Sequence, residues 1–94
     1  MESGDLGQMG ITGGLAAAIQ QDKELSNEVH LAIQRYMQCD WGNLGEEDKE
    51  MNDNAVKDPG SDRILAKYPT KQGDIYIITE HDRSYTTIMF CNEY

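Results

Sequence analysis

The loop KDPGSD, residues 57–62, is the feature that most constrains the fold, because the hydrophobic pattern differs on its two sides. Pro59 lacks a backbone donor and Gly60 readily adopts positive φ, so a helix ends before this loop. Apolar residues recur at helical spacing before the loop, whereas β-branched and aromatic residues dominate after it. This order of elements is typical of an α+β fold, and 94 residues suffice for one domain. We expect a single domain, 1–94, with a partly flexible tail over 1–10, a helical part over 12–57 and a β-meander over 62–91.

Three helices are expected in the helical part. The first follows a cap at Thr12 and covers GGLAAAIQQ, residues 13–21, whose apolar residues recur at i, i+3 and i+4. The second begins at a cap formed by Ser26 and continues to about Gln38 with one apolar face. Gly42 can adopt the left-handed conformation that ends a helix, so we expect a corner there.

The third helix is expected from about Leu44 to Val56, after a cap at Asn43. Met51 and Ala55 lie on its expected inner side, and carboxylates lie on its outer side. The acidic residues of its first turn interact favourably with the helix dipole. This pattern predicts a helix with one buried face and one strongly negative face.

Three strands are expected after the loop, over Arg63–Tyr68, Asp74–Glu80 and Tyr85–Cys91. The connections PTKQGD and HDRS have the length and the turn residues of hairpins, which favours an antiparallel meander. A short extended piece over Gln8–Ile11 is the candidate for a fourth strand. The middle strand carries apolar side chains on both faces. The predicted fold is therefore three helices packed on one face of a three-stranded antiparallel sheet.

Seventeen acidic residues against eight basic ones give a formal net charge of −9. This charge repels phosphate backbones and anionic lipids, so it argues against direct binding to nucleic acid or membranes and favours a basic protein partner. The apolar runs are too short to span a bilayer. The N-terminus also lacks the basic and apolar regions of a secretion signal, so we expect a cytoplasmic protein.

Two cysteines and two histidines are the residues that could form a zinc site. Cys39 and Cys91 are expected to be free, partly buried thiols of a reducing compartment. Their separations from His30 and His81 match no paired zinc motif. His30 is expected to be packed and hydrogen-bonded on the flank of the second helix, with a role as ligand or base as the alternative. We expect no metal and no cofactor.

Several blocks of the sequence resemble a family of short proteins carried by phages, plasmids and conjugative elements. The blocks are CDWGNLGEEDKEMNDNAV, RILAKY, IYIITEHDRSYTTIMF and the terminal NEY. Members of this family share a GDWG-like corner, an E-E-D-K run and an I-T-E-x-D-R-S-x-T-T-I block in the same order. The resemblance covers most of residues 7–94. Cys39 stands where the family usually has a Gly, and FCNEY stands where a Pro and an acidic residue usually precede the last Tyr.

The resemblance implies the context of a mobile genetic element in a bacterial host. Family members are often labelled as a type I restriction subunit M or as a plasmid-related protein. A chain of 94 residues is too short to hold a methyltransferase domain. The resemblance therefore implies a mobile-element protein and supplies no catalytic residue.

The acidic run that follows Trp41, the one tryptophan of the chain, is one candidate site. Glu46, Glu50 and Asp53 lie at i, i+4 and i+7, so their carboxylates form an outer stripe with steps of about 6 Å or less along the helix axis. Such a stripe imitates the row of charges on a nucleic-acid strand, and the alternative is an ordinary solvated helix face. Trp41 is expected to be either a buried wedge at the helical corner or an exposed anchor beside the stripe.

The turn TEHDRS, residues 79–84, is the other candidate site. Glu80, His81 and Asp82 could act as acid and base or hold a divalent cation. In the alternative interpretation, Asp82 and Ser84 bond to the turn backbone, and Arg83 pairs with Glu80 or with an acid on a helix. The sequence contains none of the usual nucleophile, phosphate-loop or zinc-protease motifs, so it favours a protein that is not an enzyme.

The predicted function is that of a non-enzymatic acidic binding protein, which blocks or modulates a basic host protein that handles nucleic acid. An anti-restriction or anti-CRISPR inhibitor is the kind of protein expected. One alternative is a small metal-dependent hydrolase centred on the TEHDRS turn, and another is an accessory subunit that forms a homodimer through its half-covered sheet face or an edge strand. Partner contacts are expected at Asp40, Trp41, Glu46, Glu47, Glu50, Asp53, Glu80, Asp82 and Arg83.

Overall fold

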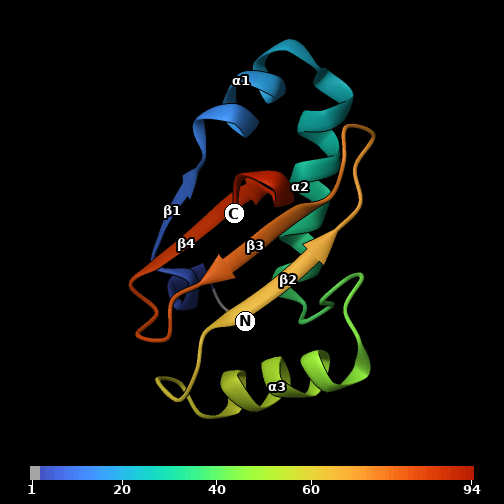
Figure 1. Ribbon diagram of the computed structural model, residues 1–94. Coiled ribbons are helices and arrows are strands. Elements are labelled where there is room, and N and C mark those ends of the chain that lie inside the picture. The colour runs from blue at the N-terminus through green and yellow to red at the C-terminus, as the bar shows by residue number, and fades with distance from the viewer. Residues whose placement is uncertain (1–2) are drawn as a thin grey trace.

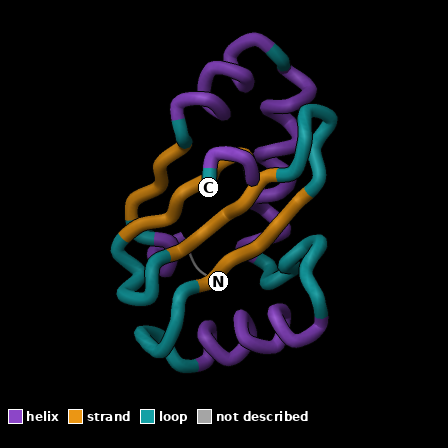
Figure 2. Tube along the Cα trace, viewed as in Figure 1, coloured by secondary structure: helices purple, strands orange, loops and turns teal. Residues whose placement is uncertain are grey.

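The computed structural model describes residues 3–94, and over this range the chain forms three α-helices, two 3-10 helices and one four-stranded sheet (Figures 1 and 2). The α+β prediction is therefore confirmed. In chain order the elements are η1 Ser3–Leu6, β1 Gln8–Ile11, α1 Gly13–Gln21, α2 Lys23–Met37, α3 Glu46–Lys57, β2 Ile64–Tyr68, β3 Ile75–Thr79, β4 Tyr85–Phe90 and η2 Cys91–Glu93.

The sheet has the strand order β1-β4-β3-β2. The expected antiparallel meander is confirmed for β2, β3 and β4. The candidate fourth strand over Gln8–Ile11 is confirmed as β1, but it runs parallel to β4, so the sheet is mixed and not antiparallel throughout. Alternating side chains do not distinguish a parallel from an antiparallel neighbour, since the side-chain period is two in both. The three helices, β2 and β3 lie between β1 and β4 in the chain. The parallel pairing of β1 with β4 therefore depends on how all these elements pack together.

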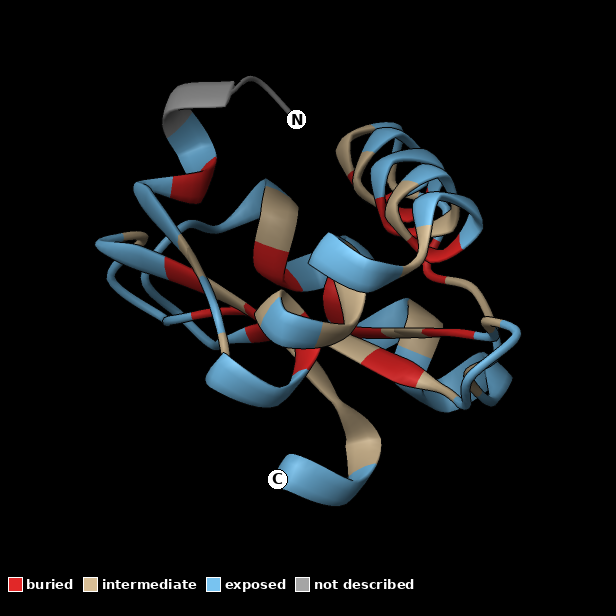
Figure 3. Ribbon diagram, turned by 90° about the horizontal axis from the view of Figure 1, so that it is seen from above, coloured by how far each residue is buried: buried red, intermediate tan, exposed pale blue. Residues whose placement is uncertain are grey.

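The core lies between α1, α2 and one face of the sheet. The expectation of three helices on one face is corrected, because α3 lies along the edge of β2 (Figure 1). Side chains alternate along the strands as expected, so every second residue points to the helices. Figure 3 shows the buried residues gathered along the strands and on the helix sides that face them. The C-terminal η2 lies on the other side of the sheet from α2 (Figures 1 and 3). The residues of the inner sheet face that are buried are Ile64, Ala66, Tyr68, Ile75, Ile77, Thr79, Thr86 and Ile88.

A chain of buried hydroxyl groups crosses this core. Thr86 Oγ1 donates to the carbonyl of Leu6 at 2.6 Å, and it lies 2.8 Å from Thr79 Oγ1. Tyr36 Oη, on α2, lies 2.6 Å from Thr79 Oγ1. Because each hydroxyl has one proton, the bonds run in one direction, from Tyr36 to Thr79 to Thr86 to Leu6. Burial raises the pKa of Tyr36, which keeps its phenol protonated as a donor. The chain of bonds fastens α2, β3, β4 and the N-terminal segment to each other.

Two of the expected helix caps are replaced by others. Asp22 separates α1 from α2 and accepts bonds from the backbone N–H groups of Glu24 and Leu25, so Ser26 lies inside α2 and is not its cap. An aspartate cap leaves a shorter break than the sequence pattern predicted. Thr12 precedes α1, but its hydroxyl makes no capping bond and donates to Glu93 at 2.8 Å.

Glu93 fastens the C-terminal end of the described chain to the start of α1. Its carboxylate accepts bonds from the Thr12 hydroxyl, the Gly14 N–H and the Phe90 N–H. These bonds, led by that of Thr12, hold the pKa of Glu93 below its ordinary value. A carboxylate near a helix N-terminus also interacts favourably with the helix dipole. A residue 81 positions away therefore supplies the cap that the sequence placed at Thr12.

The corner after α2 differs from the expectation in the residue that turns the chain. Cys39 has φ 62°, its N–H donates to the carbonyl of Tyr36, and the N–H of Asp40 donates to the carbonyl of Arg35. This pair of bonds is a Schellman motif, in which the left-handed residue is usually Gly. Gly42, the expected terminator, also has positive φ, but it lies where the backbone runs parallel to β2 and where a Cβ would collide with the carbonyl of Lys67.

Replacing Cys39 with Gly is expected to raise the free energy of unfolding by about 0.5–1 kcal/mol. A side chain in the left-handed conformation costs about 1–2 kcal/mol, and the greater backbone entropy of Gly offsets part of this gain. Urea denaturation measures the change. Cys39→Ala is the matched control, since it removes the same thiol and keeps a Cβ at positive φ. Equal stability of the two variants would show that φ at residue 39 carries no penalty.

The Glu93 contacts predict a loss of stability in acid. Because the folded pKa lies below the ordinary value of 4.5, stability from this group is present above that value and is lost as the pH falls through the folded pKa. Glu93→Gln is expected to show a shallower fall in melting temperature between neutral pH and acid. Glu47→Gln on the exposed side of α3 controls for the loss of one charge. A slope for Glu93→Gln as steep as that of the wild type would contradict this role.

Candidate functional site

The acidic helix α3 lies along the outer edge of β2, at the end of the sheet away from α1 (Figure 1). It begins at Glu46, with Gly45 as its N-cap, rather than at Leu44 with Asn43 as the cap. Carboxylates fill its first turn, at Glu46, Glu47 and Asp48. Three contacts fix α3 to the rest of the domain.

The first contact is made by Asn52, which faces β2. Its Nδ2 donates to the carbonyl of Leu65 at 2.8 Å, and its Oδ1 accepts from the N–H of Leu65 at 3.2 Å. The buried residues of α3 are Asn52 and Ala55, whereas Met51 is 55% exposed. The expectation that Met51 is buried was wrong, because the surface that α3 covers is the polar backbone edge of a strand. An amide matches that edge and a thioether does not.

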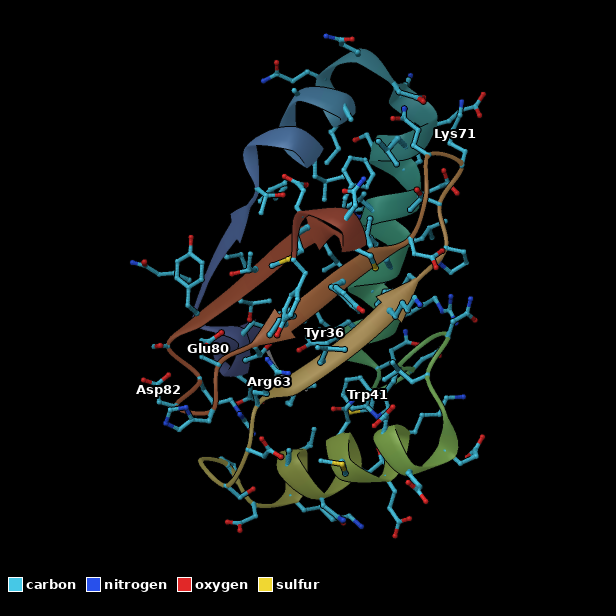
Figure 4. All side chains as sticks on the ribbon, in the orientation of Figure 1. Tyr36, Trp41, Arg63, Lys71, Glu80 and Asp82 are labelled. Atoms are coloured by element: carbon cyan, nitrogen blue, oxygen red, sulfur yellow. The ribbon has the colours of Figure 1, made fainter. Side chains whose placement is uncertain are left out.

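The second contact is made by Trp41, which lies between the sheet and α3 (Figure 4). Its side chain is 3% exposed, and its ring packs edge-on against Tyr36 with 5.4 Å between the ring centroids. Its Nε1 donates to Asp53 Oδ1 at 2.9 Å. The wedge interpretation of Trp41 is confirmed. The exposed-anchor alternative was wrong, because this ring has almost no surface to offer a partner.

The third contact comes from the TEHDRS turn. Arg83 Nη2 donates to the carbonyl of Ala55 at 2.7 Å, and Nη1 donates to the carbonyls of Asp62, Glu80 and His81. The guanidinium therefore binds backbone carbonyls near the end of α3, where a cation also complements the helix dipole. The expected pairing of Arg83 with the Glu80 carboxylate or a helix acid is not what the structure shows.

The expectation that Asp82 and Ser84 bond within the turn is confirmed. Asp82 Oδ1 accepts from both the N–H and the hydroxyl of Ser84, and these bonds lower the pKa of Asp82. Glu80 and His81 are exposed. Across residues 3–94, no group of three or more His, Cys, Asp or Glu side chains is placed to hold a metal ion.

Asp40, another expected partner contact, forms an ion pair within the domain. Arg35 Nε and Nη2 donate to its two carboxylate oxygens at 2.8 and 3.1 Å, which lowers the pKa of Asp40. The same guanidinium lies over the Tyr68 ring, 5.2 Å from the centroid. Asp40 therefore holds the corner between α2 and β2 in place.

The remaining expected contacts stay on the surface. Glu46, Glu47 and Glu50 are exposed on α3, and Lys49 approaches Glu46 at 3.9 Å. Glu80 lies at the β3–β4 turn, beyond the opposite end of α3 (Figure 4). The structure thus brings together the α3 carboxylates and leaves Glu80 and Asp82 outside that group.

A negative surface extends from α3 into the loop that follows. Residues 46–62 contain seven carboxylates and two lysines, so more than half of the net charge of −9 lies in this segment. A shallow cleft of about 440 Å³ adjoins it, and Asp48, Asp62 and Arg63 are among the residues that line it. Sequence reasoning missed Asp48 and Asp62, because the cleft forms only when the loop folds back against β2. We call Glu46, Glu47, Asp48 and Glu50 the α3 acidic face.

The other residues considered as ligands lie apart from this face. His30 is exposed and lies 3.4 Å from Gln34 Nε2, so the expectation that it is packed was wrong. Cys39 and Cys91 are free, half-buried thiols, as expected, and burial raises the pKa of Cys91. Within the described residues no helix combines the length and the apolar composition needed to cross a bilayer.

Replacing Asn52 with Ala is expected to lower the free energy of unfolding by about 1–3 kcal/mol, because it leaves the outward N–H and C=O of Leu65 without partners at a partly buried edge. Asn54→Ala, an exposed position in the same helix, is the control and is expected to change stability by less than about 0.5 kcal/mol. Urea denaturation of both variants measures the difference. Similar losses would mean that the Asn52 amide does not hold α3.

Comparisons of the chain with protein-family models, with curated proteins and with solved structures found no match.

Proposed function

We propose that this chain is a non-enzymatic binding protein of a mobile genetic element, which blocks a basic, nucleic-acid-handling protein of its bacterial host. The observation that carries this proposal is the α3 acidic face, a cluster of exposed carboxylates on one helix. Glu46 and Glu50 are one helical turn apart, so their charges repeat at about 6 Å along the helix. A basic groove that binds a nucleic-acid strand presents the complementary row of cations.

The attachment of α3 supports this use of its surface. Asn52, Trp41 and Arg83 bind the helix through its inner side and its C-terminal end, and leave the carboxylates of Glu46, Glu47 and Glu50 directed outward. A rigid helix loses little conformational entropy when it binds. Fixed charges therefore contribute more to affinity and orientation than the same charges on a mobile loop.

The charge distribution also decides which class of partner fits. Residues 46–62 carry a net charge of −5, with seven carboxylates against two lysines. Such a surface repels nucleic acid and accelerates the approach of a cationic protein surface at low ionic strength. The resemblance to proteins of phages, plasmids and conjugative elements supports a host defence enzyme, such as a restriction or CRISPR effector, as that protein.

The proposal is tested with DNA-bound host proteins. A bacterial lysate is bound to immobilised DNA, and the purified chain is added to release the proteins that it blocks. The wild type is expected to release one or a few DNA-binding proteins, which mass spectrometry identifies, and rising salt is expected to reduce the release. The triple variant Glu46→Gln, Glu47→Gln, Glu50→Gln is expected to release none of these proteins.

The matched control removes the same number of charges at the other end of the molecule. Glu24 and Glu28 contact Lys71, which lies at the end of the molecule away from α3 (Figure 4), and Asp74 pairs with Lys67. They are changed to Gln, Gln and Asn. This control is expected to release the same proteins as the wild type. Equal losses in both triple variants would assign the effect to net charge alone, and no release by the wild type would contradict the proposal.

A further inference from the structure

The two edges of the sheet differ in how their backbone groups are used. At the β2 edge, Leu65 is bonded to the Asn52 amide, and Lys67 donates to the carbonyl of Trp41 and accepts from the N–H of Asn43. A parallel bridge between Gly42 and Lys67 covers the same stretch. The outward groups of β2 therefore already have partners, and another strand cannot add here.

The β1 edge is open among the described residues. β1 forms the margin of the sheet opposite β2 (Figures 1 and 2). The N–H of Gln8 donates to Ser84 and that of Thr12 donates to Ile88, so Gln8, Gly10 and Thr12 face β4. By alternation, the N–H and C=O groups of Met9 and Ile11 point away from the sheet.

The side chains of the same two residues are large, apolar and half exposed. Met9 is 46% exposed and Ile11 is 44% exposed, although both lie on the inner side of the sheet with Thr86 and Ile88. Natural edge strands usually carry a charge, a proline or a covering segment that prevents pairing. Residues 6–21 contain no charged residue, in a chain where 27% of residues are charged. The β1 edge lacks the charges that protect edge strands in other proteins.

We infer that two copies of this chain pair through β1 in antiparallel orientation, forming one continuous eight-stranded sheet. Two chains of charge −9 repel each other over most of their surface, and this uncharged edge is the region where that repulsion is smallest. The blocked β2 edge limits assembly to two copies, because neither end of the joined sheet can accept another strand.

The register follows from the residues that point outward. Met9 of each copy lies opposite Ile11 of the other, and each of these pairs exchanges two backbone hydrogen bonds. The two-fold axis then passes between the two Gly10 residues, at a position where the backbones approach most closely and where Gly leaves room. The ring of Tyr85 lies over Gly10, at the place that a Cβ would occupy, so it covers the outer side of the joint.

The same pairing removes the exposed apolar surface. Met9 and Ile11 of both copies meet on the inner side of the joined sheet, as cross-strand neighbours. Four half-exposed side chains become mutual contacts. Residues 6–21 contain no charged residue, so none of them brings a charge into this contact. The pairing does not use α3, so it is independent of the proposed binding to a basic partner.

The test uses the full chain and two measurements. Sedimentation at increasing concentration is expected to show the mass rising from 10.6 kDa to twice that value, with tighter association at higher salt because the repulsion is screened. Amide hydrogen exchange at high concentration is expected to show protection of Met9 and Ile11 that is absent on dilution. Gln8 and Gly10, which bond to β4, are expected to be protected in both conditions.

Two variants separate pairing through β1 from other association. Met9→Pro removes an outward N–H that the monomer does not use, and is expected to weaken the dimer by at least about ten-fold. Met9→Leu keeps the N–H and the apolar side chain, and is expected to pair like the wild type. A chain that stays monomeric at every concentration would overturn the inference and leave the edge for a strand of another protein. A dimer with unprotected Met9 and Ile11 amides would overturn it equally, and that result does not depend on how the proline variant folds.

Discussion

The requirement that backbone groups at the edge of β2 find hydrogen-bond partners decides where the acidic helix lies. Unpaired backbone groups that are shielded from water destabilise a fold, so the outward face of β2 needs donors and acceptors of matching geometry. The Asn52 amide supplies one donor and one acceptor to Leu65, and the backbone on either side of Gly42 supplies the same to Lys67. With α3 attached in this way, Glu46, Glu47 and Glu50 lie on the exterior, whereas Asp53 accepts a bond from the buried Trp41. The surface that we assign to a partner is thus a consequence of edge protection.

Carboxylates serve two separate purposes in this chain. Asp22, Asp40 and Glu93 accept hydrogen bonds from helix ends, turns or cations of the domain, and these bonds lower the pKa of each. Those on the exposed side of α3 have no comparable role in the fold, apart from a distant contact with Lys49. Residues 46–62, which form α3 and the loop after it, carry a net charge of −5 out of the −9 of the chain. A surface of this kind acts over several ångströms and favours a cationic partner.

The sequence allowed the main elements to be predicted closely, because local chemistry determines them. The strands over 63–68, 74–80 and 85–91 were placed within one residue at each end, since β-branched runs and turn residues mark them clearly. The start of α1 at Gly13 was predicted correctly, although Glu93 and not the Thr12 hydroxyl bonds to its first turn. The start of α2 was placed too late because Asp22 caps it in place of Ser26, and that of α3 was placed too early. In the expected outer stripe, the outward positions of Glu46 and Glu50 were predicted correctly, whereas Asp53 accepts a bond from Trp41. The neighbouring positions were not predicted correctly, because periodicity assigned Met51 to the interior and could not foresee a buried amide.

The sequence by itself determined the α+β class, the antiparallel meander after Pro59 and the presence of one negative helix, since each depends on residues close together in the chain. Only the tertiary structure decided that β1 joins β4 in parallel, that Trp41 is a wedge bonded to Asp53, and that Arg83 binds carbonyls. These contacts join residues that are distant in sequence or use backbone groups that every residue possesses, so no local sequence pattern predicts them. They arise because each buried donor and acceptor must be matched when the elements are packed together.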